Sequence, residues 1–329
     1  MCIKKLFFLG LFAIGVNHSV ICEKSDSLSN KVKKGNFSSC IIRPTFFEIS
    51  MRSLPAINYY PASDIPQADD FEKNNLFSLK LNLPIILSEK LNVIAQLRYK
   101  SEQLHLGEYE DEYDKEIHFD NAGLSFMYHY SFDNDLFLAG HFGGYFKSDK
   151  FSFKQYSSIL DYNTSILIGK NIERGKIGLG AIFGNSLGRF SVYPLFLLDY
   201  DISNKWRIEV KLPKEIKVRR IIRPDSFYLI GGAEVHSTSY YISEDFFPGE
   251  NNIEYRRAAV EINFGIEKEI VDFLWFGVEI GITQPVYSAL VRSGNPTRDK
   301  LFDFNHTFTP YGSVSLFIVP PRSLFGKLK

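Results

Sequence analysis

The feature that most constrains this chain is a two-residue alternation of apolar and polar side chains, which recurs from about residue 43 to residue 318. Residues 77–83, for example, read Phe-Ser-Leu-Lys-Leu-Asn-Leu, and residues 91–100 repeat the pattern after a turn at 87–90. Successive side chains of a β-strand point to opposite faces, so each of these segments has one apolar face and one polar face. The alternation therefore predicts an all-β fold made of many amphipathic strands.

Fourteen segments share this pattern, so we predict about fourteen strands, with twelve as the alternative count. They lie near 43–54, 75–86, 91–101, 117–132, 135–147, 157–169, 176–186, 190–200, 205–212, 215–222, 226–240, 255–267, 273–284 and 309–318. No linker rich in Pro, Gly or Ser divides the series, so residues 43–320 are interpreted as one domain.

The connections between the strands alternate in length. Short turns, such as 87–90 and 133–135, alternate along the chain with longer polar segments at 55–74, 102–116, 241–254 and 285–308. Short periplasmic turns and long extracellular loops are typical of outer-membrane barrels. We therefore predict a single closed antiparallel transmembrane β-barrel in the outer membrane, with residues 321–329 as a periplasmic tail.

The first 22 residues resemble an export signal. Lys4 and Lys5 precede an apolar stretch at 6–16 that is too short to span a bilayer, and cleavage after Cys22 removes the segment. An acylated Cys22 is the alternative, although the residues before it are larger than such a site prefers. Residues 23–42 are predicted to form a short periplasmic lead-in, which is too small to plug a barrel.

On most strands one face is continuously apolar and the opposite face is small or polar. The apolar face must contact lipid, because the bilayer core offers charged and backbone groups no partners. The candidate lumen-lining residues are therefore Lys80, Arg98, Lys147, Asp161, Arg207, Glu209, Glu234, Arg257, Glu261 and Glu279. Two interpretations remain open: these charges line a weakly selective pore or binding cavity, or they pair with one another and fill the lumen.

Other chemistry finds little support in the sequence. The formal net charge is zero, which argues against a nucleic-acid partner. The acidic segment 102–116 has no calcium-loop spacing, so we expect a solvated face there rather than a metal site. Ser125 and His129 stand four apart on one strand, roughly 13 Å along it, which is too far for a Ser–His hydrogen bond. We expect no enzyme, no catalytic residue and no cofactor.

Several local motifs resemble a known family. Residues 206–213 form a strand that ends in Leu-Pro, a short basic strand follows at 215–220, and 227–232 carry central glycines before a Tyr240-Tyr241 pair. This arrangement resembles an uncharacterised family of Gram-negative outer-membrane β-barrels, classed as a domain of unknown function. The resemblance implies the fold and the membrane location, and it implies no catalytic residues.

The function that these patterns favour is a passive channel or small-solute translocation pore. The alternative is a closed structural or surface-interaction barrel whose extracellular loops bind a partner. The expected partners are outer-membrane lipid and lipopolysaccharide, the barrel-assembly machinery during insertion, and a small solute. An open lumen favours the channel, whereas a lumen crossed by ion pairs favours the closed barrel.

Overall fold

The structure is a computed structural model that describes residues 44–54, 59–60, 74–106, 115–149, 160–186, 189–242, 253–292, 300–304 and 308–322. The predicted signal segment 1–22, the lead-in 23–42 and residues 323–329 of the predicted tail lie outside these ranges. Within the described residues, no helix is long and apolar enough to cross a membrane.

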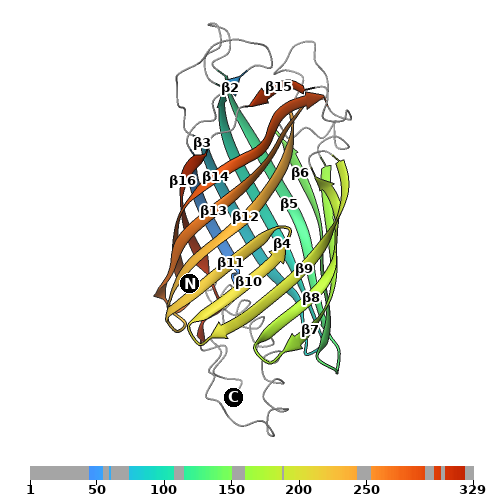
Figure 1. Cartoon of the computed structure of the whole chain (residues 1–329), viewed down its shortest axis with the longest axis vertical. Helices are drawn as coiled ribbons and strands as arrows, with labels where there is room; N and C mark the ends of the chain where they lie inside the picture. The colour runs from blue at the N-terminus through green and yellow to red at the C-terminus, as the bar shows by residue number, and fades with distance from the viewer. Residues whose placement is uncertain are drawn as a thin grey trace, which may run out of the picture.

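Fourteen antiparallel strands close into one barrel, as predicted (Figure 1). They are β1 (Phe47–Leu54), β3 (Asn74–Leu87), β4 (Leu91–Leu106), β5 (Lys115–Ser131), β6 (Leu136–Ser148), β7 (Leu160–Ile172), β8 (Gly175–Ser186), β9 (Arg189–Ser203), β10 (Trp206–Leu212), β11 (Glu215–Arg223), β12 (Phe227–Ile242), β13 (Ile253–Val271), β14 (Leu274–Arg292) and β16 (Thr309–Ile318). Neighbours in sequence pair along the wall, and the first and last strands pair with each other, so the sheet has no overall edge.

Two short strands were not predicted. β2 (Tyr59–Tyr60) pairs with β15 (Lys300–Phe304), and β15 pairs with residues 289–291 near the end of β14. Several long strands also run further than their alternation predicts: β4 continues to Leu106 and β14 to Arg292. Alternation marks a strand only where one face meets lipid and the other meets water. The extension of β14 carries apolar side chains on both faces, so its pattern is lost although the backbone ladder continues. The extension of β4 begins the acidic segment 102–116, which was interpreted as a loop.

The periplasmic turns are short, and two of them use left-handed backbone geometry. Asp135 has φ 62° and Asp225 has φ 58°, both in turns where an Asp side chain tolerates this conformation better than most residues. On the inner face, Gly123 makes room for a neighbour, because a Cβ there would stand 2.2 Å from the Tyr145 ring. A larger residue at 123 would displace that ring from the lumen wall.

The outer face carries the apolar set that the alternation assigned to it. Large hydrophobic side chains on this face are widely exposed, including Ile168, Leu179, Ile262, Phe264 and Ile280. A soluble protein would bury such a belt, whereas a closed barrel presents it to lipid. The closed antiparallel sheet and its exposed apolar belt show that the protein is an integral outer-membrane β-barrel.

The wall is uneven in height. β10 and β11 have 7 and 9 residues, whereas β12, β13 and β14 have 16, 19 and 19. The long strands continue above the others at the end where β2 and β15 lie (Figure 1). There β12 leaves β11 and touches β6, with Tyr241 opposite Ser148. The lumen therefore has a wide lower part, surrounded by fourteen strands, and a narrower upper part, surrounded by fewer strands.

Candidate functional site in the barrel lumen

The middle of the lumen is organised around Arg52, which projects from β1. Its Nη1 donates to both carboxylate oxygens of Glu261 on β13, at 2.8 and 2.7 Å, and its Nη2 lies 3.6 Å from Glu279 on β14. The guanidinium also lies over the Tyr311 ring at 4.2 Å, and the Tyr311 hydroxyl donates to Glu279 at 2.9 Å. β14 and β16 separate β1 from β13, so these side chains meet across the inner surface of the wall.

A second group of charges lies on β9, β10 and β11. Arg207 makes a two-pronged contact with Asp199, at 2.8 and 2.7 Å, and lies 3.7 Å from Glu209. Lys211 and Lys217 both approach Glu215, at 3.7 and 2.8 Å. Three directly opposite pairs in this group have opposite charges, Arg207 with Asp201, Glu209 with Lys217 and Lys211 with Glu215. Two pairs have like charges, Glu209 with Asp199 and Arg207 with Arg219, and diagonal neighbours supply their counter-charges.

The structure brings most of the sequence-predicted candidates into ion pairs on one face. Lys147 pairs with Asp161. Lys80 lies 3.6 Å from Glu48 and stands opposite Arg98 across the β3–β4 ladder. Further placements are Arg207 beside Glu209, Glu261 and Glu279 on Arg52, Glu234 opposite Glu261 on β13, and Arg257 with Glu102.

Sequence reasoning missed several partners of these groups. Arg52, Glu48, Asp199, Glu215 and Arg219 were not among the candidates, yet each makes an ion pair on the inner face. Parity along the strands was the signal that could have found them. Glu48, Ser50 and Arg52 alternate with Ile49 and Met51, for example, and Met51 is exposed on the lipid face.

We call the charged inner-face residues below the upper lumen the middle layer; they include Glu48, Arg52, Lys80, Arg207, Lys211 and Lys214. Several of these charges are accessible to water. The side chains of Lys80 and Glu48 are 38% and 34% exposed. Lys211 and Lys214, next to the tip of the β10–β11 hairpin, are 52% and 59% exposed. These strands have lipid on their other side, so the water that reaches these groups must lie within the barrel.

The upper lumen is packed shut. Phe119 of β5 is fully buried and stacks on Tyr240 of β12, at 4.7 Å between ring centroids, and on Tyr255 of β13, at 5.4 Å. Beside them, Arg257 donates to Glu102 at 3.0 Å, with only 11% and 4% of the two side chains exposed. At this level β12 pairs with β6, so only β6 separates β5 from β12. β4 and β13 are three strands apart on one side and four on the other, so the contact between Glu102 and Arg257 crosses the upper lumen. We call this layer, Glu102, Phe119, Tyr240, Tyr255 and Arg257, the extracellular seal.

The seal corrects one prediction. Glu102 was assigned to a solvated acidic loop at 102–116, but it lies within β4 and is buried. The reason is the extended pairing of β4 with β5, which places Glu102 opposite Phe119 on the inner face. Residues 107–114 of that loop lie outside the described residues. Among the described residues, no group of three ligand-type side chains could hold a metal ion.

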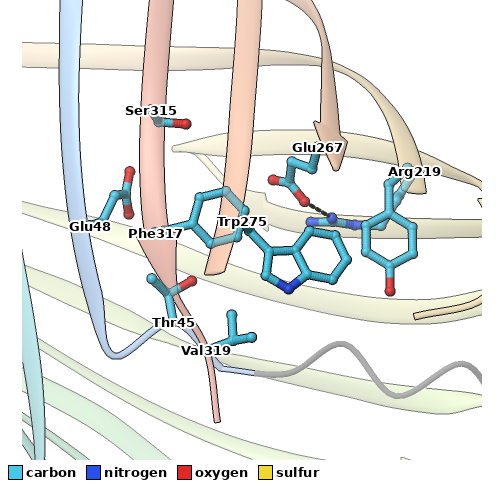
Figure 2. A pocket seen from close by; sticks show the side chains of 9 residues that line it. Thr45, Glu48, Arg219, Glu267, Trp275, Ser315, Phe317 and Val319 are labelled. Carbon is cyan, nitrogen blue, oxygen red and sulfur yellow. Dashed lines mark hydrogen bonds and ion pairs between the residues drawn. The ribbon is translucent and has the colours of Figure 1, made fainter. Parts of the chain in front are cut away.

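The periplasmic end has a smaller apolar cluster on one wall. Ile221, Tyr228, Ile230, Trp275 and Val319 are buried together, with Phe317 packed against them. Tyr228 and Trp275 stack at 5.3 Å, and Arg219, hydrogen-bonded to Glu267, lies over the Tyr228 ring. A cavity of about 130 Å³ lies here, lined by Thr45, Glu48, Arg219, Tyr228, Glu267, Trp275, Ser315, Phe317 and Val319 (Figure 2). The cluster comes from β11, β12, β14 and the chain after β16, so it covers only part of the mouth.

The chain beyond β16 is fastened to this wall. Arg322 donates to Glu269 and to Asp272, at 3.0 Å in the second case, and its Nη2 donates to the Asp225 carbonyl at 2.6 Å. The hydrogen bond that Arg322 donates to Glu269 raises the pKa of Arg322 above its usual value. The contacts fasten the chain after β16 to two periplasmic turns, β11–β12 and β13–β14, which holds Val319 in the apolar cluster.

One motif that sequence reasoning overlooked also has a clear structural context. Gly184-Asn-Ser186-Leu-Gly188 matches the G-x-S-x-G pattern of hydrolase nucleophiles. In hydrolases that pattern forms a sharp turn between a strand and a helix. Here Ser186 ends β8 and pairs with Arg189 at the start of β9, so the motif spans an antiparallel hairpin. The local structure is therefore not that of a nucleophile elbow.

Comparisons with solved structures give outer-membrane proteins of low identity and low TM-score. An outer-membrane channel from Pseudomonas putida F1 is 10% identical, with 86% of this chain and 100% of that chain covered and a TM-score of 0.42. The monoaromatic hydrocarbon channel TodX is 10% identical, with 85% and 91% covered and a TM-score of 0.43. Outer-membrane phospholipase A from Escherichia coli is 12% identical, with 92% and 98% covered and a TM-score of 0.35.

Identities this low carry no information about function, and a search of curated proteins finds no match. A family model does match, over residues 48–285, which is most of the chain and nearly the whole barrel. Its description, a domain of unknown function, confirms the resemblance inferred from the β10–β12 motifs. The chain belongs to the DUF6268 family.

Proposed function

We propose that the protein is a passive channel for small solutes, in a state whose extracellular end is closed. The observation that carries this proposal is the hydrated middle layer. Lys80, Glu48, Lys211 and Lys214 are each exposed by a third or more, inside a barrel whose outer face meets lipid. Such groups need water around them, and that water occupies a continuous polar space.

The extracellular seal shows what a filled lumen looks like in this protein. There the charges are almost completely buried, aromatic rings stack on one another, and opposite walls are in contact. The middle layer differs in each respect, although its residue types are similar. The charged pairs of the middle layer therefore line a space rather than fill one.

The lining favours small polar solutes without strong charge selectivity. Bases such as Arg52 and Arg207 alternate with acids such as Glu261 and Asp199 around the same surface. Rings of one sign make a pore selective, whereas interspersed signs leave little net field along the axis. Passage requires the seal to open or a route that avoids it.

Conductance of the purified protein in a planar bilayer tests the proposal. We expect small, infrequent openings from the native protein and larger, more frequent openings from Phe119→Ala, because that change removes the central ring of the seal. Phe142→Ala is the matched control, since Phe142 is exposed on the lipid face of β6. Silence from native and Phe119→Ala protein alike would overturn the channel and support the closed barrel.

The closed surface-interaction barrel remains the second candidate because of the seal itself. Stacking of Phe119 on Tyr240 and Tyr255, where β12 meets β6, stiffens the end from which the extracellular segments emerge. A barrel that serves only to display those segments would benefit from this rigidity. It would have no use for the hydrated charges below, which is why the channel is preferred.

A further inference from the structure

The short hairpin of β10 and β11 leaves two strand edges without partners in the wall. β9 pairs with β10 only from Phe196 to Ser203, so 189–195 pair with β8 alone. β12 pairs with β11 only from Phe227 to Glu234, and its upper part pairs with β13 and leans onto β6. Among the described residues, no strand lies between these two edges. We call this stretch of wall, above the hairpin tip at 213–214, the side window.

The side window lies at the depth of the lipid. Phe190 and Val192, on the outer face of β9 beside it, are among the most exposed hydrophobic residues of the apolar belt. Seven residues of strand span roughly 23 Å, which is about half of the length of β9 on the extracellular side. Unpaired backbone at this depth is tolerated only against protein or against a water-filled cavity.

Two observations indicate that the window communicates with the lumen. Tyr193 has the same parity as Asp199, which contacts Arg207 on the inner face, yet its side chain is 41% exposed. Lys214 at the hairpin tip lies 3.8 Å from the inward Glu234 and interacts electrostatically with Arg98 on the far side of the lumen. A residue of inward parity is thus accessible at one edge of the window, and a charged group at the lower edge interacts with charges of the lumen.

The chemistry around the window is cationic below and apolar at the rim. Lys211 and Lys214 are 52% and 59% exposed, whereas their partners Glu215 and Glu234 are only 14% and 25% exposed, so the charges that an incoming solute meets first are cationic. The rim above and beside them carries the exposed apolar side chains of Leu212, Tyr193 and Val235. An anionic head group would find lysine donors inside, while an attached apolar chain would extend between the two edges into lipid.

We propose that the side window is a lateral route between the lumen and the outer leaflet for amphipathic anions with a single apolar chain. This inference rests on the proposed channel function and adds a second class of solute, which would pass through the wall, to the small polar solutes that the middle layer favours. It also explains how a lumen with a closed extracellular end can carry traffic, because the solute leaves through the wall. A cationic amphiphile would meet the exposed ammonium groups of Lys211 and Lys214, and a solute without an apolar chain would gain nothing from the lipid-facing rim.

Binding of two probes with the same chain tests the chemistry. Dodecanoate and dodecyltrimethylammonium would be titrated into protein in a neutral detergent, below the micelle-forming concentration of each probe. We expect dodecanoate to bind more tightly, and Lys211→Gln with Lys214→Gln to weaken it by about tenfold or more. Lys90→Gln, in an exposed periplasmic turn, is the control and should change nothing. Equal affinity for both probes, or no effect of the paired change, would overturn the proposal.

A conductance experiment tests the route. In Phe119→Ala, Cys40→Ser protein, dodecanoate added to the lipid should block the current. Labelling Tyr193→Cys with a bulky maleimide should slow that block by about tenfold or more, whereas labelling the adjacent lipid-facing Val192→Cys should not. Block that is unchanged by the Tyr193 label would exclude the side window and leave the channel intact. If no variant conducts, the channel proposal fails, and the probe titration still decides whether the window binds anions.

Discussion

The extracellular seal and the middle layer contain the same kind of ion pair in opposite surroundings. Glu102 and Arg257 meet at 3.0 Å, with 4% and 11% of their side chains exposed, whereas Glu48 and Lys80 meet at 3.6 Å, with 34% and 38% exposed. The first pair joins strands on opposite sides of the barrel, and the second joins neighbouring strands. A charged pair in a barrel therefore closes the lumen or lines it according to which walls it connects.

Strand length explains why the two regions differ. β4, β5, β12, β13 and β14 continue upward after β10 and β11 have ended, and β12 then approaches β6. Fewer strands surround the upper lumen, so opposite walls come within reach of aromatic side chains. The same shortening that narrows the top leaves the side window in the wall below it.

The largest expected effect is on the seal. Phe119→Ala should lower the free energy of unfolding by about 3–5 kcal/mol, because it leaves a cavity between two stacked tyrosines. Urea titration in lipid vesicles, followed by tryptophan fluorescence, would measure it. Phe142→Ala on the lipid face should cost clearly less. Equal losses at the two sites would mean that the seal is no better packed than the lipid contact.

The next test asks whether β14 has the assigned face inside. Ile280→Arg should destabilise the barrel by about 2–4 kcal/mol if it lies near the midplane, since Ile280 is 62% exposed on the lipid face. Glu279→Gln on the opposite face should cost less, although it weakens the contacts with Arg52 and Tyr311. If the milder change were Ile280→Arg, the register would be shifted by one residue and the inner and outer faces exchanged.

Replacing an acid in each region compares the two pairs directly. Glu102→Gln should cost about 2–3 kcal/mol, because it leaves Arg257 charged and buried. Glu48→Gln should cost less than about 1 kcal/mol, since water can solvate Lys80. Thermal unfolding monitored by heat-modifiable gel mobility would rank both variants. Similar costs would indicate that water reaches both regions equally.

The alternation in the sequence was enough to predict the barrel, its strand number and which residues share a face. Leu79 and Lys80, for example, were assigned to opposite faces from period 2 alone, and a register that closes around fourteen strands keeps them there. This worked because lipid and water impose opposite demands on adjacent residues along the belt.

Pairings between distant strands were beyond such reasoning. Glu102 looked like one of a run of loop acids, and its partner Arg257 is 155 residues away. Arg52 depends on how β1 closes against β16 and β14, which no local pattern encodes. The side window was hidden for the same reason, because 205–212 and 215–222 were counted as two full strands of the wall. Their 7 and 9 residues become significant only beside the longer β9 and β12.

The smallest expected effect concerns ion selectivity in the middle layer. Lys80→Gln with Arg98→Gln, in the Phe119→Ala background, removes two adjacent cross-strand bases from the lining. Stability should change by less than about 1 kcal/mol, because Glu48 is hydrated. The reversal potential in a salt gradient should nevertheless move toward cation selectivity, since lumen acids such as Glu48 and Glu234 would then outweigh the remaining bases. Lys90→Gln with Lys170→Gln makes the same change of charge in a periplasmic turn and on the outer face, and should leave the reversal potential where it was. A large loss of stability without a shift in selectivity would instead place Lys80 and Arg98 in a filled lumen like that of the seal, and the contrast between the two regions would disappear.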